Sequence, residues 1–214
     1  KSGVMHGLTR VRSFAQDDSH IYCTREQIGS ELDQVYAMIQ EVYRSLGLGK
    51  PDFVLETCPP DYQGTPEMRA ESERKLREWL ERTGLAFTVS EGQGTHYAPK
   101  VGLNFRDSIG RPWTLGTMQL DYVLPSRFDL VYMAEDGRQT QPVMIHRAIL
   151  GSLERFLGVY IEHTGGRFPL WIAPEQVRVM TITDREIPAA ERVAKVLREK
   201  GLRVGTDFRG EKVN

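Results

Sequence analysis

The stretch HRAILGSLERFLG, residues 146–158, decides the fold, because a buried strand passes into a helix within it. The apolar run PVMI at residues 142–145 precedes it and predicts a short buried strand. From Ile149 to Ile161 the apolar residues recur at three- and four-residue steps, which predicts a helix with one apolar face. We therefore expect the strand to give way to the helix near Arg147.

Two polar side chains interrupt this apolar pattern. Arg155 lies on a predicted helix with an apolar face, so it must pair with an acid such as Glu154 or bind an anionic ligand. His146 lies in the predicted strand, where a histidine is more often a hydrogen-bonded core residue than a metal ligand. On these residues alone, a salt bridge and a core histidine are the simpler hypotheses.

The chain before this stretch predicts strands and two helices. Residues 8–14 and 19–23 alternate well enough for two short strands, and a helix with a core-facing apolar stripe follows to about Leu46. A strand is expected near residues 53–55, and a second, heavily charged helix after Thr65. Its charges predict a solvated face with pairs four residues apart, namely Glu71 with Lys75, Glu73 with Arg77, and Glu78 with Arg82.

The rest of the chain predicts an antiparallel sheet and then a parallel one. From Phe87 to about Tyr132, short strand-like segments separated by turn residues are typical of an antiparallel meander. After Pro174 a strand, a helix and a strand form a βαβ unit, which favours a parallel sheet. The predicted fold class is α/β (α+β): an antiparallel sheet flanked by helices, followed by the start of a βαβ domain. We place the domains at residues 1–174 and 175–214.

Composition excludes several classes of protein. With 214 residues, 40% of them hydrophobic and 27% charged, the chain is neither disordered nor membrane-spanning. A formal charge of -1 does not by itself indicate nucleic-acid binding. Two cysteines and the lack of a signal peptide predict an intracellular, cytoplasmic protein without a disulfide framework.

Residues 146–158 closely resemble the third signature motif of class II aminoacyl-tRNA synthetases, and in detail that of the threonyl-tRNA synthetase family. Three further segments resemble that family in its order: residues 7–20 its second motif, 116–128 its central strands, and 168–177 its domain junction. The resemblance covers nearly the whole chain. It implies a class II catalytic core followed by the beginning of an anticodon-binding domain, as a fragment of a longer protein.

The resemblance implies a zinc ion held by His20 and His146. Its third ligand would be a cysteine upstream of this chain; Cys23, three residues after His20, would point to the opposite face of a strand. The zinc would bind the amine and hydroxyl of threonine. Such a site is useful because an apolar pocket discriminates between amino acids of the same shape by only about 10²-fold. A site that requires a hydroxyl discriminates against amino acids that lack it by about 10⁴- to 10⁵-fold.

The resemblance also implies an ATP site. Arg10 and Arg155 match the arginines that hold the triphosphate, Phe14 matches the aromatic residue that stacks on adenine, and Arg12 is a secondary candidate. A planar guanidinium suits phosphate oxygens better than an ammonium does. On a strand, Arg10, Arg12 and Phe14 would share one face. We expect Mg²⁺ on the phosphates.

The remaining matches concern threonine and the reaction. Asp18, Tyr97 and Gln119 match residues of the amino-acid pocket, while Gln16 and Lys100 match residues near the threonine carboxylate and the reacting phosphate. The implied activity is that of a threonine–tRNA ligase: the carboxylate attacks the α-phosphorus of ATP, and threonine is then transferred to tRNA(Thr) for protein synthesis. The first step needs charge neutralisation and alignment, so Arg10, Gln16, Lys100 and Arg155 are the expected catalytic residues.

Departures from the family keep two alternatives open. Ala98, Gly102 and Thr114 stand where the family usually has glycine, an acid and glutamine, and residues 55–60 depart from its usual arginine-containing strand. A non-catalytic, synthetase-like binding or regulatory protein would explain them. A zinc hydrolase is weaker, because no H-E-x-x-H motif is present. The family's dimer-forming motif and two further ATP contacts would precede Lys1, so we expect the intact protein to be a homodimer and residues 1–214 alone to be inactive.

Overall fold

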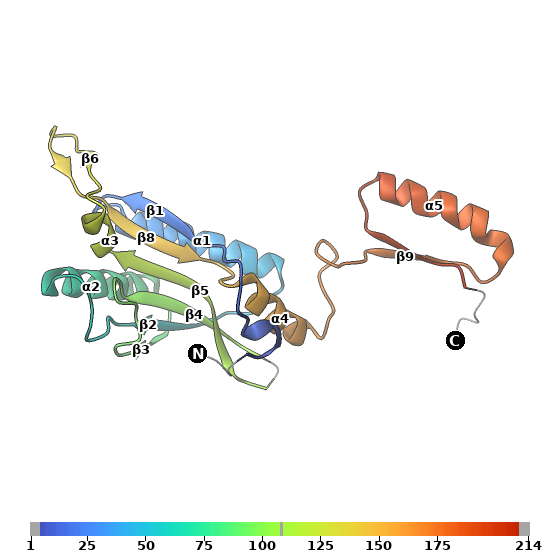
Figure 1. Ribbon diagram of the computed structural model, residues 1–214, viewed down its shortest axis with the longest axis horizontal. Helices are drawn as coiled ribbons and strands as arrows, with labels where there is room; N and C mark the ends of the chain where they lie inside the picture. Colours follow the sequence, from blue (N-terminus) through green and yellow to red (C-terminus); the bar gives the residue numbers. More distant parts are fainter. Residues whose placement is uncertain (1–4, 108, 210–214) are drawn as a thin grey trace. The chain divides into compact units, whose positions relative to one another are not determined.

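A six-stranded sheet is the centre of the first of two units into which the chain divides, Lys1–His163 and Thr164–Asn214. A computed structural model describes residues 5–107 and 109–209 of the protein. The strands lie in the order β1-β8-β5-β4-β2-β3 (Figure 1). Their bounds are β1 Ser19–Cys23, β2 Asp52–Glu56, β3 Phe87–Ser90, β4 Lys100–Arg106, β5 Pro112–Asp121 and β8 Val143–Ala148.

The predicted antiparallel sheet flanked by helices is confirmed, with one exception at its edge. Strands β1, β8, β5, β4 and β2 all pair antiparallel. Strand β3 pairs parallel with β2, because the helix α2, Pro66–Thr83, carries the chain back across the sheet between them. The first unit therefore has a mixed sheet.

Two long helices lie behind the sheet in Figure 1. Helix α1, Ile28–Ser45, has the predicted apolar stripe: Tyr36 and Val42 are half-buried, and its other members are buried, namely Ile28, Leu32, Val35, Ile39, Tyr43 and Leu46. Thr65 caps the start of helix α2, because its hydroxyl oxygen accepts a hydrogen bond from the Met68 N–H at 3.2 Å. Helix α4, Leu153–Thr164, packs near the start of the chain, and the smaller elements are α3 Val123–Arg127, β6 Tyr132–Met133, β7 Gln139–Thr140 and a 3₁₀ turn Gly7–Thr9.

Two predictions on local structure are wrong. Residues 8–14 do not form a strand: Gly7 has a φ of 49°, and hydrogen bonds from Thr9 and Arg10 N–H to the His6 carbonyl close a tight turn. The chain also leaves β8 later than expected. The strand continues to Ala148 because it pairs with β1 on one side and β5 on the other, and helix α4 starts only at Leu153.

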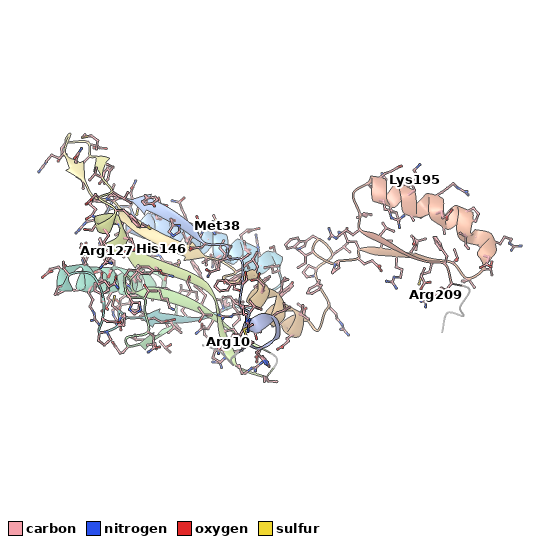
Figure 2. All side chains as sticks on the ribbon, in the orientation of Figure 1. Arg10, Met38, Arg127, His146, Lys195 and Arg209 are labelled. Atoms are coloured by element: carbon pink, nitrogen blue, oxygen red, sulfur yellow. The ribbon has the colours of Figure 1, made fainter. Side chains whose placement is uncertain are left out.

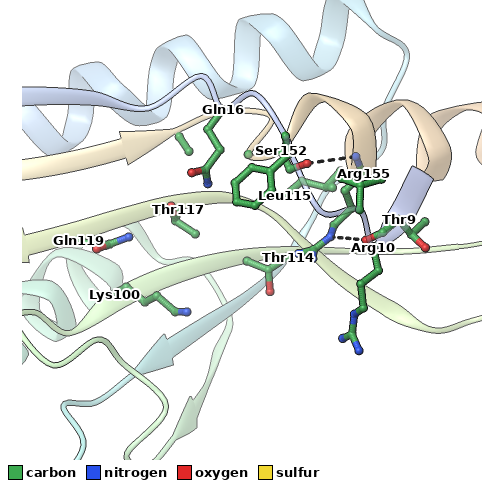
Figure 3. A pocket seen from close by; sticks show the side chains of 14 residues that line it. Thr9, Arg10, Gln16, Lys100, Thr114, Leu115, Thr117, Gln119, Ser152 and Arg155 are labelled. Carbon is green, nitrogen blue, oxygen red and sulfur yellow. Dashed lines mark hydrogen bonds between the residues drawn. The ribbon is translucent and has the colours of Figure 1, made fainter. Parts of the chain in front are cut away.

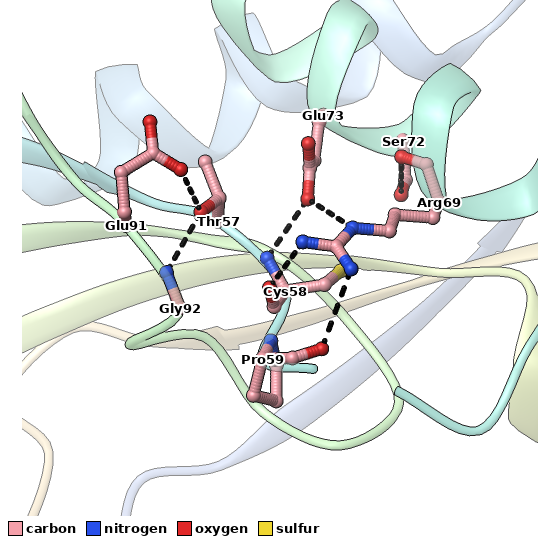
Figure 4. Close-up of polar contacts among 8 residues, drawn as sticks. All are labelled: Thr57, Cys58, Pro59, Arg69, Ser72, Glu73, Glu91 and Gly92. Atoms are coloured by element: carbon pink, nitrogen blue, oxygen red, sulfur yellow. Dashed lines mark hydrogen bonds and ion pairs between the residues drawn. The ribbon is translucent and has the colours of Figure 1, made fainter. Parts of the chain in front are cut away.

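The charged face of α2 does more than face solvent. The three predicted pairs give way to partners on neighbouring elements or to other pairs at the same four-residue spacing, namely Arg25 with Glu71, Arg82 with Asp33, Arg69 with Glu73, and Arg74 with Glu78. Glu73 accepts a hydrogen bond from the Cys58 N–H at 2.9 Å, and Arg69 donates to the Cys58 carbonyl at 2.7 Å (Figure 4). Backbone N–H and C=O groups in the turn after β2 need hydrogen-bond partners, and these side chains supply them.

The segment before β1 is held to the turn before α4 by one carboxylate. Asp17 accepts hydrogen bonds from the N–H groups of Ile149 at 2.8 Å, Leu150 at 3.1 Å and Gly151 at 2.8 Å. Glu154 adds a second link, since both its oxygens accept from the Ala15 N–H at 3.1 Å. We call this set of contacts the Asp17 clamp; it joins parts of the chain more than 130 residues apart.

The second unit contains the predicted strand–helix–strand pattern. Strands β9, Val177–Met180, and β10, Val204–Asp207, pair parallel, and helix α5, Ile187–Glu199, connects them after a 3₁₀ turn at Asp184–Glu186. The contact boundary between the units lies at residues 163/164, whereas the sequence places a domain junction at 174/175, which stays a prediction. In the described part of the chain, every helix is too short or too polar to cross a bilayer.

We predict that Asp17→Asn destabilises the first unit by about 2 to 4 kcal/mol, because a charged acceptor of three backbone N–H groups becomes a neutral one with a single acceptor atom. Urea unfolding followed by circular dichroism measures this free energy. The control is Asp136→Asn, in which an exposed aspartate in the turn between β6 and β7 accepts one backbone hydrogen bond, from the Arg138 N–H, and pairs with the exposed Arg138 guanidinium. Equal free energies of unfolding for the two variants would refute the clamp.

Candidate functional site

A pocket of about 310 Å³ lies where the N-terminal segment, β4, β5 and the turn before α4 meet (Figure 3). Six of the predicted site residues line it: Arg10, Phe14, Gln16, Lys100, Gln119 and Arg155. In Figure 3, Lys100 and Gln119 lie on neighbouring strands at one end of the pocket, and Arg10 and Arg155 at the other. The structure thus brings together residues that the sequence assigns to the amino acid and to the nucleotide.

Strand register places four predicted site residues in one row across the sheet. Lys100 on β4 is opposite Gln119 on β5, Gln119 is opposite His146 on β8, and His146 is opposite His20 on β1. Residues directly opposite one another on neighbouring strands project from the same face of a sheet. We call these residues the cross-strand row; it connects the pocket to the two histidines.

The histidine end of the row has the donor atoms of a metal site. The His20 and His146 ring centroids are 4.6 Å apart, and one donor atom each from Asp18, His20 and His146 lie within 4.8 Å of one another. Asp18 Oδ2 is 3.9 Å from His20 Nε2. Imidazole nitrogens and a carboxylate oxygen suit zinc, so these residues fit the metal that the resemblance implies.

A buried carboxylate also contacts the His146 ring. Its Nε2 lies 2.8 Å from Asp121 Oδ2, and the two side chains are only 7% and 0% exposed. This contact occupies Nε2 and leaves Nδ1 as the free ring nitrogen, in the manner of carboxylates that orient metal-binding histidines. His146 is therefore both a hydrogen-bonded buried histidine and a neighbour of His20. Figure 2 shows it on β8 within the sheet.

Tyr97 and Gln119 lie beside this cluster. The Tyr97 ring centroid is 5.2 Å from that of His146, and burial, reinforced by the charges of Asp121 and Asp18, raises the pKa of Tyr97 above its usual value. Its hydroxyl therefore stays protonated. Gln119 Oε1 is buried and has no hydrogen-bond partner within the described residues, so it is available to a donor on a ligand.

The other end of the pocket is built around Arg155. Its Nε donates to the Thr9 carbonyl at 3.1 Å and its backbone N–H to Ser152 Oγ at 3.3 Å (Figure 3). Its guanidinium carbon lies 5.7 Å from the centroid of the Trp113 ring. Phe14 is 55% exposed, which leaves its ring free to stack. Arg12 is exposed and does not line the pocket, because the strand that was to align it with Arg10 and Phe14 does not form.

Three site residues were not predicted from the sequence. Asp17 organises the turn before α4, Asp121 holds His146, and Glu56 pairs with Lys100 at 2.9 Å. Asp121 could have been found, since it follows Gln119 by two residues and shares its strand face. Glu56 and Asp17 depend on a register and a turn that local sequence does not specify.

The family model of the tRNA synthetase class II core domain (G, H, P, S and T) matches residues 1–164. A threonine–tRNA ligase of Parvibaculum lavamentivorans is 47% identical over 212 residues, covering 99% of this chain and 32% of the ligase. One of Clostridium tetani is 47% identical over 213 residues, covering 99% and 33%. The chain spans about a third of the length of these curated relatives.

Solved structures agree with these relatives. A threonyl-tRNA synthetase structure from Cryptosporidium parvum Iowa II, described as its RNA binding domain, is 40% identical with a TM-score of 0.94, covering 100% of this chain and 54% of that one. A Giardia lamblia prolyl-tRNA synthetase in complex with prolyl-adenylate is 17% identical with a TM-score of 0.70, covering 99% and 39%, and supports the fold alone.

We predict that Gly151→Ala distorts the pocket and destabilises the first unit by about 3 kcal/mol, because a Cβ in this left-handed conformation would also clash with backbone. Gly151 has a φ of 69°, and its Cβ would lie 2.5 Å from the Leu115 carbonyl oxygen. Gly137 is the matched control: its φ is 76° but nothing lies within 4 Å of the added atom, so Gly137→Ala should cost only about 1 kcal/mol. Chemical denaturation of both variants compares them, and equal losses would contradict the clash.

Proposed function

The chain belongs to the class II tRNA synthetase core family, and from this premise we propose that it is the catalytic core of a threonine–tRNA ligase. The protein would convert threonine and ATP to threonyl-adenylate and pyrophosphate, and then transfer threonine to tRNA(Thr). The observation that carries the proposal is the cross-strand row, which joins a candidate metal cluster to an arginine-lined pocket through Gln119 and Lys100. The names of the relatives support the choice of threonine.

We propose that His20 and His146 hold a zinc ion, with Asp121 fixing the His146 ring. When bound, the ion would supply two coordination positions that together demand an amine and a neighbouring hydroxyl. Asp18 would accept a hydrogen bond from the threonine hydroxyl. The buried Gln119 Oε1 would accept one from an N–H of the substrate amine, since it has no partner in the described part of the chain.

The pocket's cationic groups would act on the nucleotide. Arg10 and Arg155 would bind the phosphates of ATP with its Mg²⁺, and the exposed Phe14 ring would stack on adenine. Lys100 and Gln16 would lie between the two substrates. In the first step a threonine carboxylate oxygen forms a bond to the α-phosphorus and pyrophosphate leaves, so alignment and charge neutralisation lower the barrier without a proton transfer.

Further parts of the proposal concern the intact protein. We propose that residues 175–214 begin an anticodon-binding domain, that the protein is a cytoplasmic homodimer, and that it acts in protein synthesis. The alternative is a synthetase-like binding or regulatory protein without catalysis, for which Gly102 and Thr114 are the observations. The two functions differ in one measurable property, the threonine-dependent exchange of pyrophosphate into ATP.

We predict that the intact protein carrying this chain catalyses this exchange, and that His20→Ala and His146→Ala lose zinc and lower exchange together, by more than about 100-fold. His163→Ala is the control, because His163 is an exposed histidine in the last turn of α4. Zinc content is measured on the same samples. Absence of exchange in the unmodified protein would support the non-catalytic alternative, and exchange without zinc would refute the metal's role.

We also predict the order in which amino acids are activated. Valine lacks the hydroxyl and should be activated about 10⁴- to 10⁵-fold less efficiently than threonine, whereas serine lacks only a methyl group and should lose about 10- to 200-fold. The values of kcat/KM for exchange with each amino acid measure this. A valine penalty no larger than that of serine would mean that selection rests on shape rather than on the hydroxyl.

A further inference from the structure

We propose that Glu56 is the positioning residue of Lys100, and that position 102 is glycine because the Glu56 carboxylate occupies the space its side chain would need. This inference rests on the proposed function, because that function supplies the substrate that Lys100 would contact. The contact between the two side chains can be tested without that function.

Strand register brings the pair together. Glu56, the last residue of β2, is opposite Lys100, the first residue of β4. Lys100 Nζ is 2.9 Å from Glu56 Oε2, and the side chains are 22% and 12% exposed. A lysine on a surface samples many rotamers, whereas this one is largely enclosed and tied at its charged end. The pair therefore differs from the exposed ion pairs of α2.

Gly102 provides the room for this pair. It is buried two residues along β4 from Lys100, on the same strand face. A Cβ at this position would lie 2.9 Å from Glu56 Oε1 and 3.5 Å from Thr114 Cγ2. A side chain at 102 would meet the carboxylate, which would have to shift from the position in which it pairs with Lys100. The glycine at position 102 departs from the family and so favours the non-catalytic alternative. In this chain it also has a structural reason, which is the room that it leaves for the Glu56 carboxylate.

The pairing has a consequence for chemistry in the pocket. An ammonium has three N–H donors, and Glu56 takes up one of them, so the others remain for ligands while the nitrogen is fixed in place. Lys100 is also opposite Gln119, the residue between the pocket and the histidines. At that point an aligned ammonium would meet the carboxylate and phosphate oxygens that react. The carboxylate also offsets one positive charge, so it aids alignment rather than ATP affinity.

The first experiment tests the contact itself. In the 214-residue chain labelled with ¹⁵N-lysine, the Lys100 ammonium signal is assigned with Lys100→Arg, and its hydrogen exchange with water is measured. We expect Glu56→Gln to accelerate this exchange about tenfold, as loss of local protection would. Gly102→Ala should do the same without removing a charge, which keeps the test informative if the first variant folds poorly. Glu78→Gln, in an exposed pair with Arg74, is the control. Unchanged exchange in Glu56→Gln and Gly102→Ala would overturn the proposal.

The second experiment tests the consequence in the intact protein. Glu56→Gln should lower kcat for threonine-dependent pyrophosphate exchange by about 10- to 100-fold, as a misplaced catalytic group would, without raising the KM for ATP. Lys100→Ala should lower kcat and raise that KM. A kcat unchanged in Glu56→Gln, or a raised KM for ATP, would overturn the positioning role. If the unmodified protein shows no exchange, the proposed function fails, while the ammonium signal still decides whether Glu56 positions Lys100.

Discussion

The contact between the Asp17 carboxylate and three backbone N–H groups of the turn before α4 is the constraint on which the site depends. That turn, between β8 and α4, has its N–H groups directed at one point, and an anion at this point is strongly stabilised. The protein supplies its own anion from the segment before β1. As a result, Arg155 at the start of α4 and the N-terminal residues that line the pocket with it share one rigid support.

The sheet supplies a second constraint, on distance. Neighbouring strands lie about 4.8 Å apart, so a row of residues on four strands spans about 14 Å. The cross-strand row therefore sets the separation between the histidines and the pocket end at Lys100 by backbone hydrogen bonds rather than by side-chain packing. Two of its four members are in turn held from outside the row: His146 by Asp121 and Lys100 by Glu56.

Much of this arrangement could be predicted from the sequence, and the exceptions share a physical cause. The stripe of α1, the cap at Thr65 and the parallel β9–β10 pair follow from periodicity and capping, which are local. The resemblance named six residues that line the pocket. The prediction of a strand at residues 8–14 was wrong because an alternating pattern of apolar and polar residues cannot by itself supply a neighbouring strand to hydrogen-bond with. The predicted charge pairs of α2 were wrong because backbone groups in the turn after β2 and an aspartate on α1 bind the same side chains.

The cross-strand row also limits how such a chain can change over evolution. A slip of one residue in β8 would turn His146 to the other face of the sheet and remove Gln119's neighbour at the same time. The histidine end and the pocket end of the row therefore cannot shift independently along the strands. Length variation should instead collect where no member of the row is moved, as in the β6–β7 hairpin. The register of one sheet thus fixes the positions of both ends of the candidate site together.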